Sequence, residues 1–193
     1  KNILEGLLKR SPSHYGEYEE TVNGIIEQVR ARGDQAVFDY TKQFDKCELT
    51  AKNLVVTRAE IEEAYRALDG ELIGTMKRSA ENIRAYHEKQ VRQSFFATKP
   101  DGSILGQRIT PLGRAGVYVP GGKAAYPSSV LMNVVPAKVA GVAEIIMTTP
   151  PGKDGKVNPG TLVAADIAGV DRVYKAGGAQ AIAAMAFGTE SIP

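Results

Sequence analysis

Apolar residues recur at helical spacing through much of the first half of the chain. The spacing predicts three helices, over residues 17 to 32, from 34 to about 44, and from about 71 to 92. Gly33 is a typical helix stop, and Asp34 is expected to cap the helix that follows it. The first part of the chain is therefore expected to be mainly helical.

Shorter patterns complete this first part. The run from Thr57 to Glu60 has the form of a capping box and follows a short apolar strand at 54 to 56. Two extended segments, at 94 to 98 and 104 to 110, are separated by turn residues and predict a hairpin. Within the second helix, the residues expected to face inward are Val37, Tyr40 and Phe44.

From residue 113 the pattern changes to apolar strands that alternate with helices. Strands are expected near 115 to 119, 144 to 148 and 172 to 175, and helices near 127 to 140, 159 to 168 and 179 to 186. This alternation is typical of an α/β fold, in which right-handed crossovers place helices over a parallel sheet. The first strand has the composition of a buried strand, and Pro136 is expected to kink or break the first helix.

Composition changes at the same place as the pattern. Residues 1–112 hold 34 of the 46 charged residues, whereas residues 113–193 hold 12 of the 20 glycines. We therefore expect a mainly helical N-terminal region with short strands over 1–112 and a separate sheet domain over 113–193. The net charge of +2 comes from interspersed charges, which does not favour nucleic-acid binding.

Other bulk properties exclude further classes of protein. No apolar run approaches the roughly 20 residues that span a bilayer, so no membrane association is expected. The single cysteine, Cys47, excludes an internal disulfide and fits a cytoplasmic location. Its neighbours show no sign of a depressed thiol pKa or a nearby base, so we interpret it as unreactive.

Two glycine turns follow strands of the second part and suggest a ligand site. Gly121 and Gly122 follow the first strand, and a second glycine pair follows the third, at the edge where ligands of open parallel sheets gather. A helix start after such a turn suits an anion, although a plain tight turn is the simpler interpretation. Tyr118 and Gln180 flank these turns. From physics alone, they are a core or rim aromatic and a helix-start residue.

Several segments resemble one known family much more specifically. The segments are 113–122, 127–137, 142–151 and 176–193, with shorter matches at 31–36 and 44–46. In amino-acid sequence and in their order along the chain, these segments resemble the NAD-binding half of bacterial histidinol dehydrogenase. The resemblance covers nearly the whole chain.

The resemblance implies a fold and a set of site residues. It implies an incomplete Rossmann-like domain of the aldehyde-dehydrogenase-like class, with NAD bound by Tyr118 and Gln180 beside Gly121 and Gly122. The third NAD contact of the family, the zinc ligands and the catalytic acid–base pair would all lie beyond Pro193. We therefore expect the chain to be the amino-terminal portion of such an enzyme, to hold neither catalytic residues nor metal ligands, and to be inactive alone.

The family implies an activity for the whole protein. It would be a zinc- and NAD-dependent oxidoreductase of histidine biosynthesis that converts L-histidinol to L-histidine through the aldehyde, acting as a homodimer in the cytoplasm. A stand-alone nucleotide-binding module or a dimerisation module is the alternative.

Other residue types with chemical potential have simpler interpretations. His14 and His87 lie far from any nucleophile in sequence, and no histidine in the second part completes a metal-ligand set. Asp171 is considered for a ribose hydroxyl, but its spacing from the first glycine turn is too long. Either Lys123 or the following helix start could pair with pyrophosphate, against the simpler interpretation of a solvated lysine.

Overall fold

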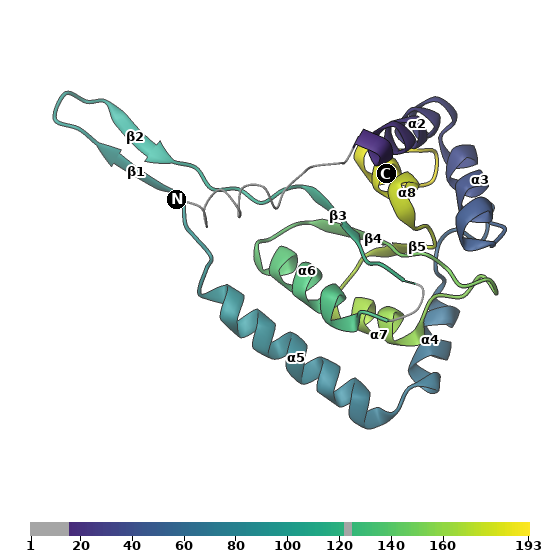
Figure 1. The fold of residues 1–193 in the computed structure, drawn as a ribbon. Helices are drawn as coiled ribbons and strands as arrows, with labels where there is room; N and C mark the ends of the chain where they lie inside the picture. The colour runs from purple at the N-terminus through teal and green to yellow at the C-terminus, as the bar shows by residue number, and fades with distance from the viewer. Residues whose placement is uncertain (1–15, 122–124) are drawn as a thin grey trace, which may run out of the picture.

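A computed structural model describes residues 16–121 and 125–193 and shows an α/β fold (Figure 1). Within the described residues, four helices precede a hairpin: α2 (Gly16–Arg32), α3 (Asp34–Asp45), α4 (Arg58–Ala67) and α5 (Gly70–Glu88). The hairpin consists of β1 (Phe95–Thr98) and β2 (Ile104–Gln107). Strands and helices then alternate: β3 (Arg114–Tyr118), α6 (Pro127–Val139), β4 (Glu144–Thr148), α7 (Pro159–Ala168), β5 (Arg172–Tyr174) and α8 (Gly178–Phe187). The expected fold class and hairpin are confirmed.

The second part forms a parallel sheet with the strand order β3, β4, β5. The short segment 54–56 joins the outer side of β5 as an antiparallel bridge, in which the Val56 amide donates to the Val173 carbonyl at 2.9 Å. The prediction of a buried strand at 115–119 holds only in part. Val119 is buried, and Ala115 and Val117 are partly buried against the core. Gly116 remains exposed, because β3 is an edge strand that pairs with β4 on one side only.

Helices cover both faces of this sheet (Figure 1). Alternate side chains of β4 point to opposite faces: Ile145 packs with α4 to α7, whereas Ile146 packs with α2, α3 and α8. Each apolar cluster thus combines residues from before and after position 112. A division of the chain into domains at 112/113 stays a prediction.

The described part of the chain up to residue 112, which we call the helical leader, follows the predicted pattern with local differences. The capping box at the start of α4 is confirmed, with Thr57 and Glu60 bonded in both directions. Helix α5 ends at Glu88, earlier than expected. Phe44 does not face inward: it is 50% exposed, and it stacks on Tyr40 at a centroid distance of 5.6 Å along the surface of α3.

Two further expectations about helices need correction. Asp34 does not cap α3, because Gly33 occupies the cap position and the Asp34 side chain instead accepts bonds from residues 189 and 191. Helix α6 is not broken by Pro136. The carbonyl that loses its donor there belongs to Met132, an exposed residue, so water can replace the missing bond.

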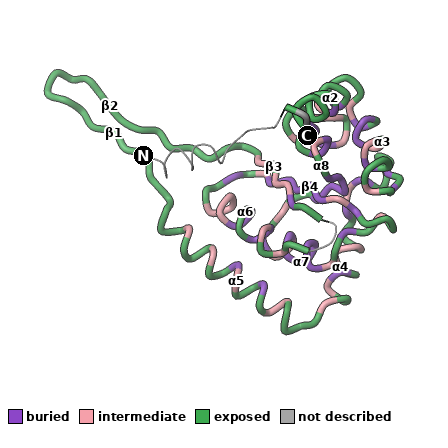
Figure 2. The backbone as a smooth tube through the Cα atoms, in the orientation of Figure 1, coloured by how far each residue is buried: buried purple, intermediate pink, exposed green. Residues whose placement is uncertain are grey.

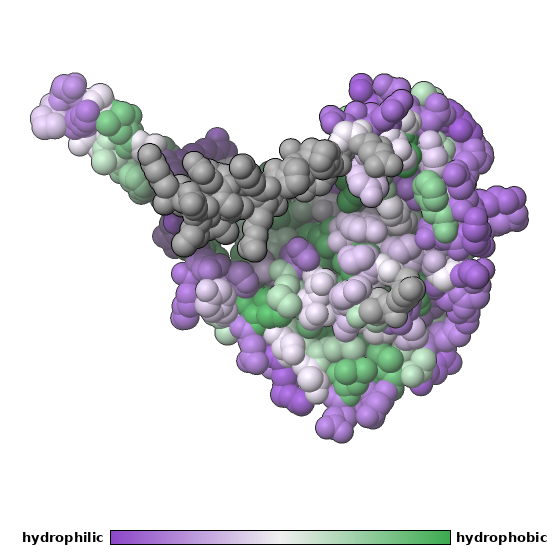
Figure 3. All heavy atoms as spheres, in the orientation of Figure 1, coloured by the Kyte–Doolittle hydropathy of each residue, from purple (hydrophilic) through white to green (hydrophobic). Residues whose placement is uncertain are grey.

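The hairpin projects away from the rest of the described chain. None of its strand residues is buried, as the tube in Figure 2 shows. Its exposed apolar side chains include Phe95, Phe96, Ile104 and Leu105, which stand out in Figure 3 between the more polar tip and the body. Among residues 16–121 and 125–193, no helix is long and apolar enough to cross a membrane.

Candidate functional site

Three loops converge at the carboxyl edge of the parallel sheet. They follow β3, β4 and β5, and they meet at Pro150. A Cβ built on Gly121 would lie 2.8 Å from Cγ of Pro150, and one built on Gly177 would lie 2.5 Å from its Cβ. Both glycines are therefore needed, because any side chain would collide with the proline between them.

The structure brings Tyr118 and Gln180 together at this edge. The amide of Gly178 donates to the hydroxyl of Tyr118 at 3.4 Å. The side chain of Gln180 folds back against the same glycine, so that a Cβ on Gly178 would lie 2.6 Å from Oε1 of Gln180. A residue of the second glycine turn, Gly178, thus lies between the two side chains.

Gln180 is the most unusual polar residue of this edge. It is 1% exposed, and neither its Oε1 nor its Nε2 has a hydrogen-bond partner among the described residues. A buried amide without partners costs stability, and such groups in native proteins require an explanation. A ligand or a further segment that supplies both a donor and an acceptor would satisfy it.

A cleft lies beside the first glycine turn. Its volume is about 390 Å³, and it extends from Gly121 and Pro150 to the start of α7. The start of α7 is not a free anion site, because the side chain of Asn158 accepts from the amides of Gly160 and Thr161. Gly122 and Lys123, which were also expected in this region, lie outside the described residues.

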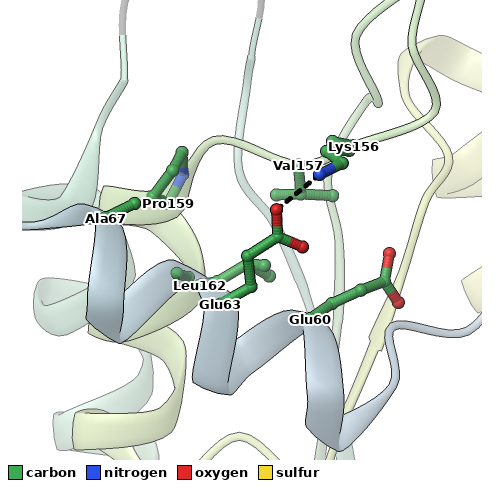
Figure 4. A pocket seen from close by; sticks show the side chains of 8 residues that line it. Glu60, Glu63, Ala67, Lys156, Val157, Pro159 and Leu162 are labelled. Atoms are coloured by element: carbon green, nitrogen blue, oxygen red, sulfur yellow. Dashed lines mark hydrogen bonds and ion pairs between the residues drawn. The ribbon is translucent and has the colours of Figure 1, made fainter.

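Two ion pairs that the sequence did not suggest join helix α4 to the loop after β4 and to the end of β5. Lys156, in the loop after β4, donates to Glu63 of α4 at 2.5 Å across a cavity of about 60 Å³ (Figure 4). Lys175, at the end of β5, is buried and pairs with Glu60 on the same helix. Only the role of Glu60 in the capping box was visible in the sequence. Its lysine partner is 115 residues away.

The ionisation of Glu60 reflects this pair. Burial alone would raise the pKa of its carboxyl, but the bonds from Lys175 and Thr57 outweigh burial and lower the pKa below its usual value. Glu60 is therefore held as a carboxylate that neutralises a buried ammonium.

Other candidates have structural roles. Asp171 lies before β5, at the opposite edge of the sheet, where it accepts from the Ile145 amide at 2.7 Å and from Lys138 at 2.9 Å. It cannot contact a ligand at the glycine turns. Burial raises the pKa of the Cys47 thiol, which agrees with an unreactive cysteine. His87 bonds to Gln90, and His14 lies outside the described residues.

No group of three side chains among the described residues has the composition of a metal site.

An open parallel sheet with glycine turns at its carboxyl edge defines an α/β protein of the class that binds ligands at that edge. Within this class, residues 8–193 match the family model of histidinol dehydrogenase. The chain belongs to the histidinol dehydrogenase family.

Individual relatives agree with this assignment. The chain is 54% identical over 192 residues to a histidinol dehydrogenase of Clostridium acetobutylicum, covering 100% of this chain and 44% of the relative. It is 58% identical over 164 residues to that of Heliobacterium mobile, covering 85% of this chain and 38% of the relative. A crystal structure of the enzyme from Elizabethkingia anophelis matches with a TM-score of 0.85 at 37% identity, over 91% of this chain and 40% of that one. The chain thus spans less than half the length of these relatives.

Proposed function

We propose that this chain carries the NAD-binding part of a zinc-requiring, NAD-dependent histidinol dehydrogenase, which oxidises L-histidinol to L-histidine through L-histidinaldehyde in the cytoplasm. The observation that carries the proposal is the buried amide of Gln180, which has no hydrogen-bond partner among the described residues. It lies two residues after Gly178, whose backbone amide donates to the Tyr118 hydroxyl. The family match supports the choice of NAD among possible ligands.

The residues of the sheet edge fit a dinucleotide. Gly121 offers a surface without a side chain beside the cleft, and Tyr118 offers a ring with a hydroxyl. The side chain of Gln180 offers an NH₂ group that donates and a carbonyl oxygen that accepts, and an amide or a sugar hydroxyl can match both. When bound, NAD would supply the acceptor for hydride. The chain's own residues would bind and orient it.

The described residues do not fit zinc, since they offer no set of three ligating side chains. We place the zinc ligands and the catalytic acid–base pair in the part of the relatives that this chain does not cover. The isolated chain is accordingly expected to show no turnover of L-histidinol with zinc and NAD added. Turnover above that of a heat-inactivated sample would contradict this.

The cofactor proposal is tested by titrating the chain with NAD in a calorimeter. We expect saturable binding, weakened about tenfold by Tyr118→Phe, because the variant loses one hydrogen bond to the ligand. Tyr86→Phe is the matched control, since Tyr86 is an exposed tyrosine of α5. Equal affinity of the two variants would remove Tyr118 from the site.

The second candidate is a dimerisation module, and the exposed apolar hairpin favours it. It agrees with the homodimer that we propose for the whole enzyme. Sedimentation velocity over a range of chain concentrations distinguishes the candidates. A module that serves only dimerisation associates without measurable NAD affinity.

A further inference from the structure

The loop that follows α8 is bonded to the start of α3, more than 150 residues earlier in the chain. Five residues make this contact, which we name the α3–α8 latch: Gly33, Asp34, Thr189, Glu190 and Ser191. It lies on the same side of the sheet as α8, near the C-terminal end of the described chain (Figure 1).

One half of the latch caps α3. Gly33 adopts a φ of 54°, which disfavours side chains, and it provides no capping group for the helix. The carboxylate of Glu190 occupies the space where a Gly33 side chain would stand and accepts from the Asp34 amide at 2.8 Å. A side chain from the far end of the chain thus replaces the local cap.

The other half runs in the reverse direction. The buried carboxylate of Asp34 accepts from the Thr189 hydroxyl at 2.6 Å, from the Ser191 amide at 3.2 Å and from the Ser191 hydroxyl. Thr189 also bonds to both backbone groups of Ile192, a residue with no exposed surface. Asp34 therefore holds the three donors of Thr189 and Ser191, and Thr189 in turn bonds to the buried Ile192.

The latch fixes the end of α8 opposite to Gln180. Helix α8 ends at Phe187, two residues before Thr189, and Gln180 lies in its first turn. At about 1.5 Å per residue, the two ends of this ten-residue helix are about 15 Å apart, a distance over which a helix moves as one rod. Between the two ends, Met185 packs closely on Gly116 of β3, since a Cβ on that glycine would lie 2.8 Å from the methionine sulfur.

We infer that Asp34 is a positioning residue for the nucleotide site: through Thr189 and Ser191 it sets the place of α8 and hence of the Gln180 amide. The inference rests on the proposed NAD site. It assigns to the helical leader a role in binding geometry beyond that of a cover for the sheet.

The test compares Asp34→Ala, Asp34→Asn and the control Asp39→Ala in the full 193-residue chain. Asp39 lies on the same helix and is exposed. Two properties are measured below the unfolding transition: the side-chain amide resonances of Gln180 by NMR, and NAD affinity by calorimetry. Asp34→Ala is expected to shift the Gln180 resonances and weaken NAD binding about tenfold, a loss of about 1.4 kcal/mol.

Asp34→Asn, the conservative variant, should keep the Gln180 resonances and the NAD affinity close to those of the wild type. Asparagine keeps one acceptor for Thr189 and the Ser191 amide, and the Ser191 hydroxyl can rotate to accept from its NH₂ group. Asp39→Ala should match the wild type. Loss of thermal stability alone, with unchanged Gln180 resonances and NAD affinity in folded Asp34→Ala, would overturn the inference.

Failure of the proposed function gives a different result. If the wild-type chain does not bind NAD, the cofactor assignment of this chain fails, and the Gln180 resonances alone decide on the latch. Displaced resonances in Asp34→Ala support it, and unmoved resonances reject it. Should Asp34→Ala not fold, Thr189→Val removes one of the bonds to Asp34 and is judged by the same two measurements.

Discussion

Helices α7 and α8 each contain ten residues and begin at the same edge of the sheet, yet their first turns differ. Helix α7 begins with Asn158, whose side chain occupies two backbone amides, and with Pro159, which has no amide to satisfy. Helix α8 begins with glycines and has no side-chain cap. It buries the amide of Gln180, which finds no hydrogen-bond partner within residues 16–121 and 125–193. The first turn of α7 is therefore satisfied by its own side chains, whereas the first turn of α8 leaves the Gln180 amide available to a ligand or to a further segment.

The largest expected effect concerns the ion pair that joins α4 to the end of β5, shortly before the start of α8. Glu60→Gln keeps the capping box but leaves the buried Lys175 ammonium uncompensated, which should lower the free energy of unfolding by about 3 kcal/mol. Urea unfolding measures it. Glu62→Gln, an exposed change on the same helix, should cost less than about 0.5 kcal/mol.

The effect of Glu60→Gln should depend on pH. Because the folded pKa of Glu60 is lowered, its contribution is fully present above the unfolded value of about 4.3 and is lost as pH falls through the folded pKa. Wild type and variant should therefore converge in stability in acid. A difference that stays constant from pH 7 down to acid would show that the charge is not responsible.

A second pair of variants compares glycines at the two helix starts. Gly177→Ala brings a Cβ against Pro150 although its backbone angles suit any residue, so overpacking should destabilise the chain by about 2 kcal/mol. In α7, Gly160→Ala gains helix propensity, and its Cβ would lie 3.2 Å from Oδ1 of Asn158 and 4.0 Å from Cε of Met76, at the end of a flexible side chain. Its effect should stay within about 0.5 kcal/mol. Thermal unfolding measures both, and similar losses would contradict the close-packing argument.

The smallest expected effects test the comparison most directly. Gln180→Met removes an unpartnered buried amide at similar volume, so it should stabilise the chain by about 1 kcal/mol while weakening NAD binding about tenfold. Asn158→Ala should destabilise the chain by about 1 kcal/mol, because two amides of α7 lose their cap. If Gln180→Met lost stability without losing affinity, the amide would be structural.

Local patterns predicted the helices and strands well, because periodicity and capping depend on residues close in sequence. The capping box at Thr57 and the strand at 144 to 148 are examples. The exposure of β3 could not be predicted, since it depends on strand order and not on the composition of the strand. Phe44 and the helix around Pro136 departed from expectation because both depend on which parts of the folded chain face solvent, the Phe44 side chain in one case and Met132 in the other.

The candidate site shows the same limit. Glycine turns after strands indicated the carboxyl edge of the sheet, where Tyr118 and Gln180 lie, but only the resemblance singled out these two side chains. Thr189, a partner of Asp34, lies 155 residues away in the chain. An acidic residue at a helix start therefore predicted a local cap, and no local pattern indicated the α3–α8 latch. The pairing of Lys175 with Glu60 left no sequence signal for a similar reason.

The projecting hairpin has a consequence for the order in which backbone hydrogen bonds open. Strand β4 lies between two partners beneath helices, so its amides should exchange with solvent deuterium only when the whole chain unfolds. Strands β1 and β2 pair only with each other, and two-stranded ribbons are marginally stable in water. Their amides should exchange through local fraying, and a protease that acts on transiently open backbone should cut first near Gly102, at the tip of the ribbon.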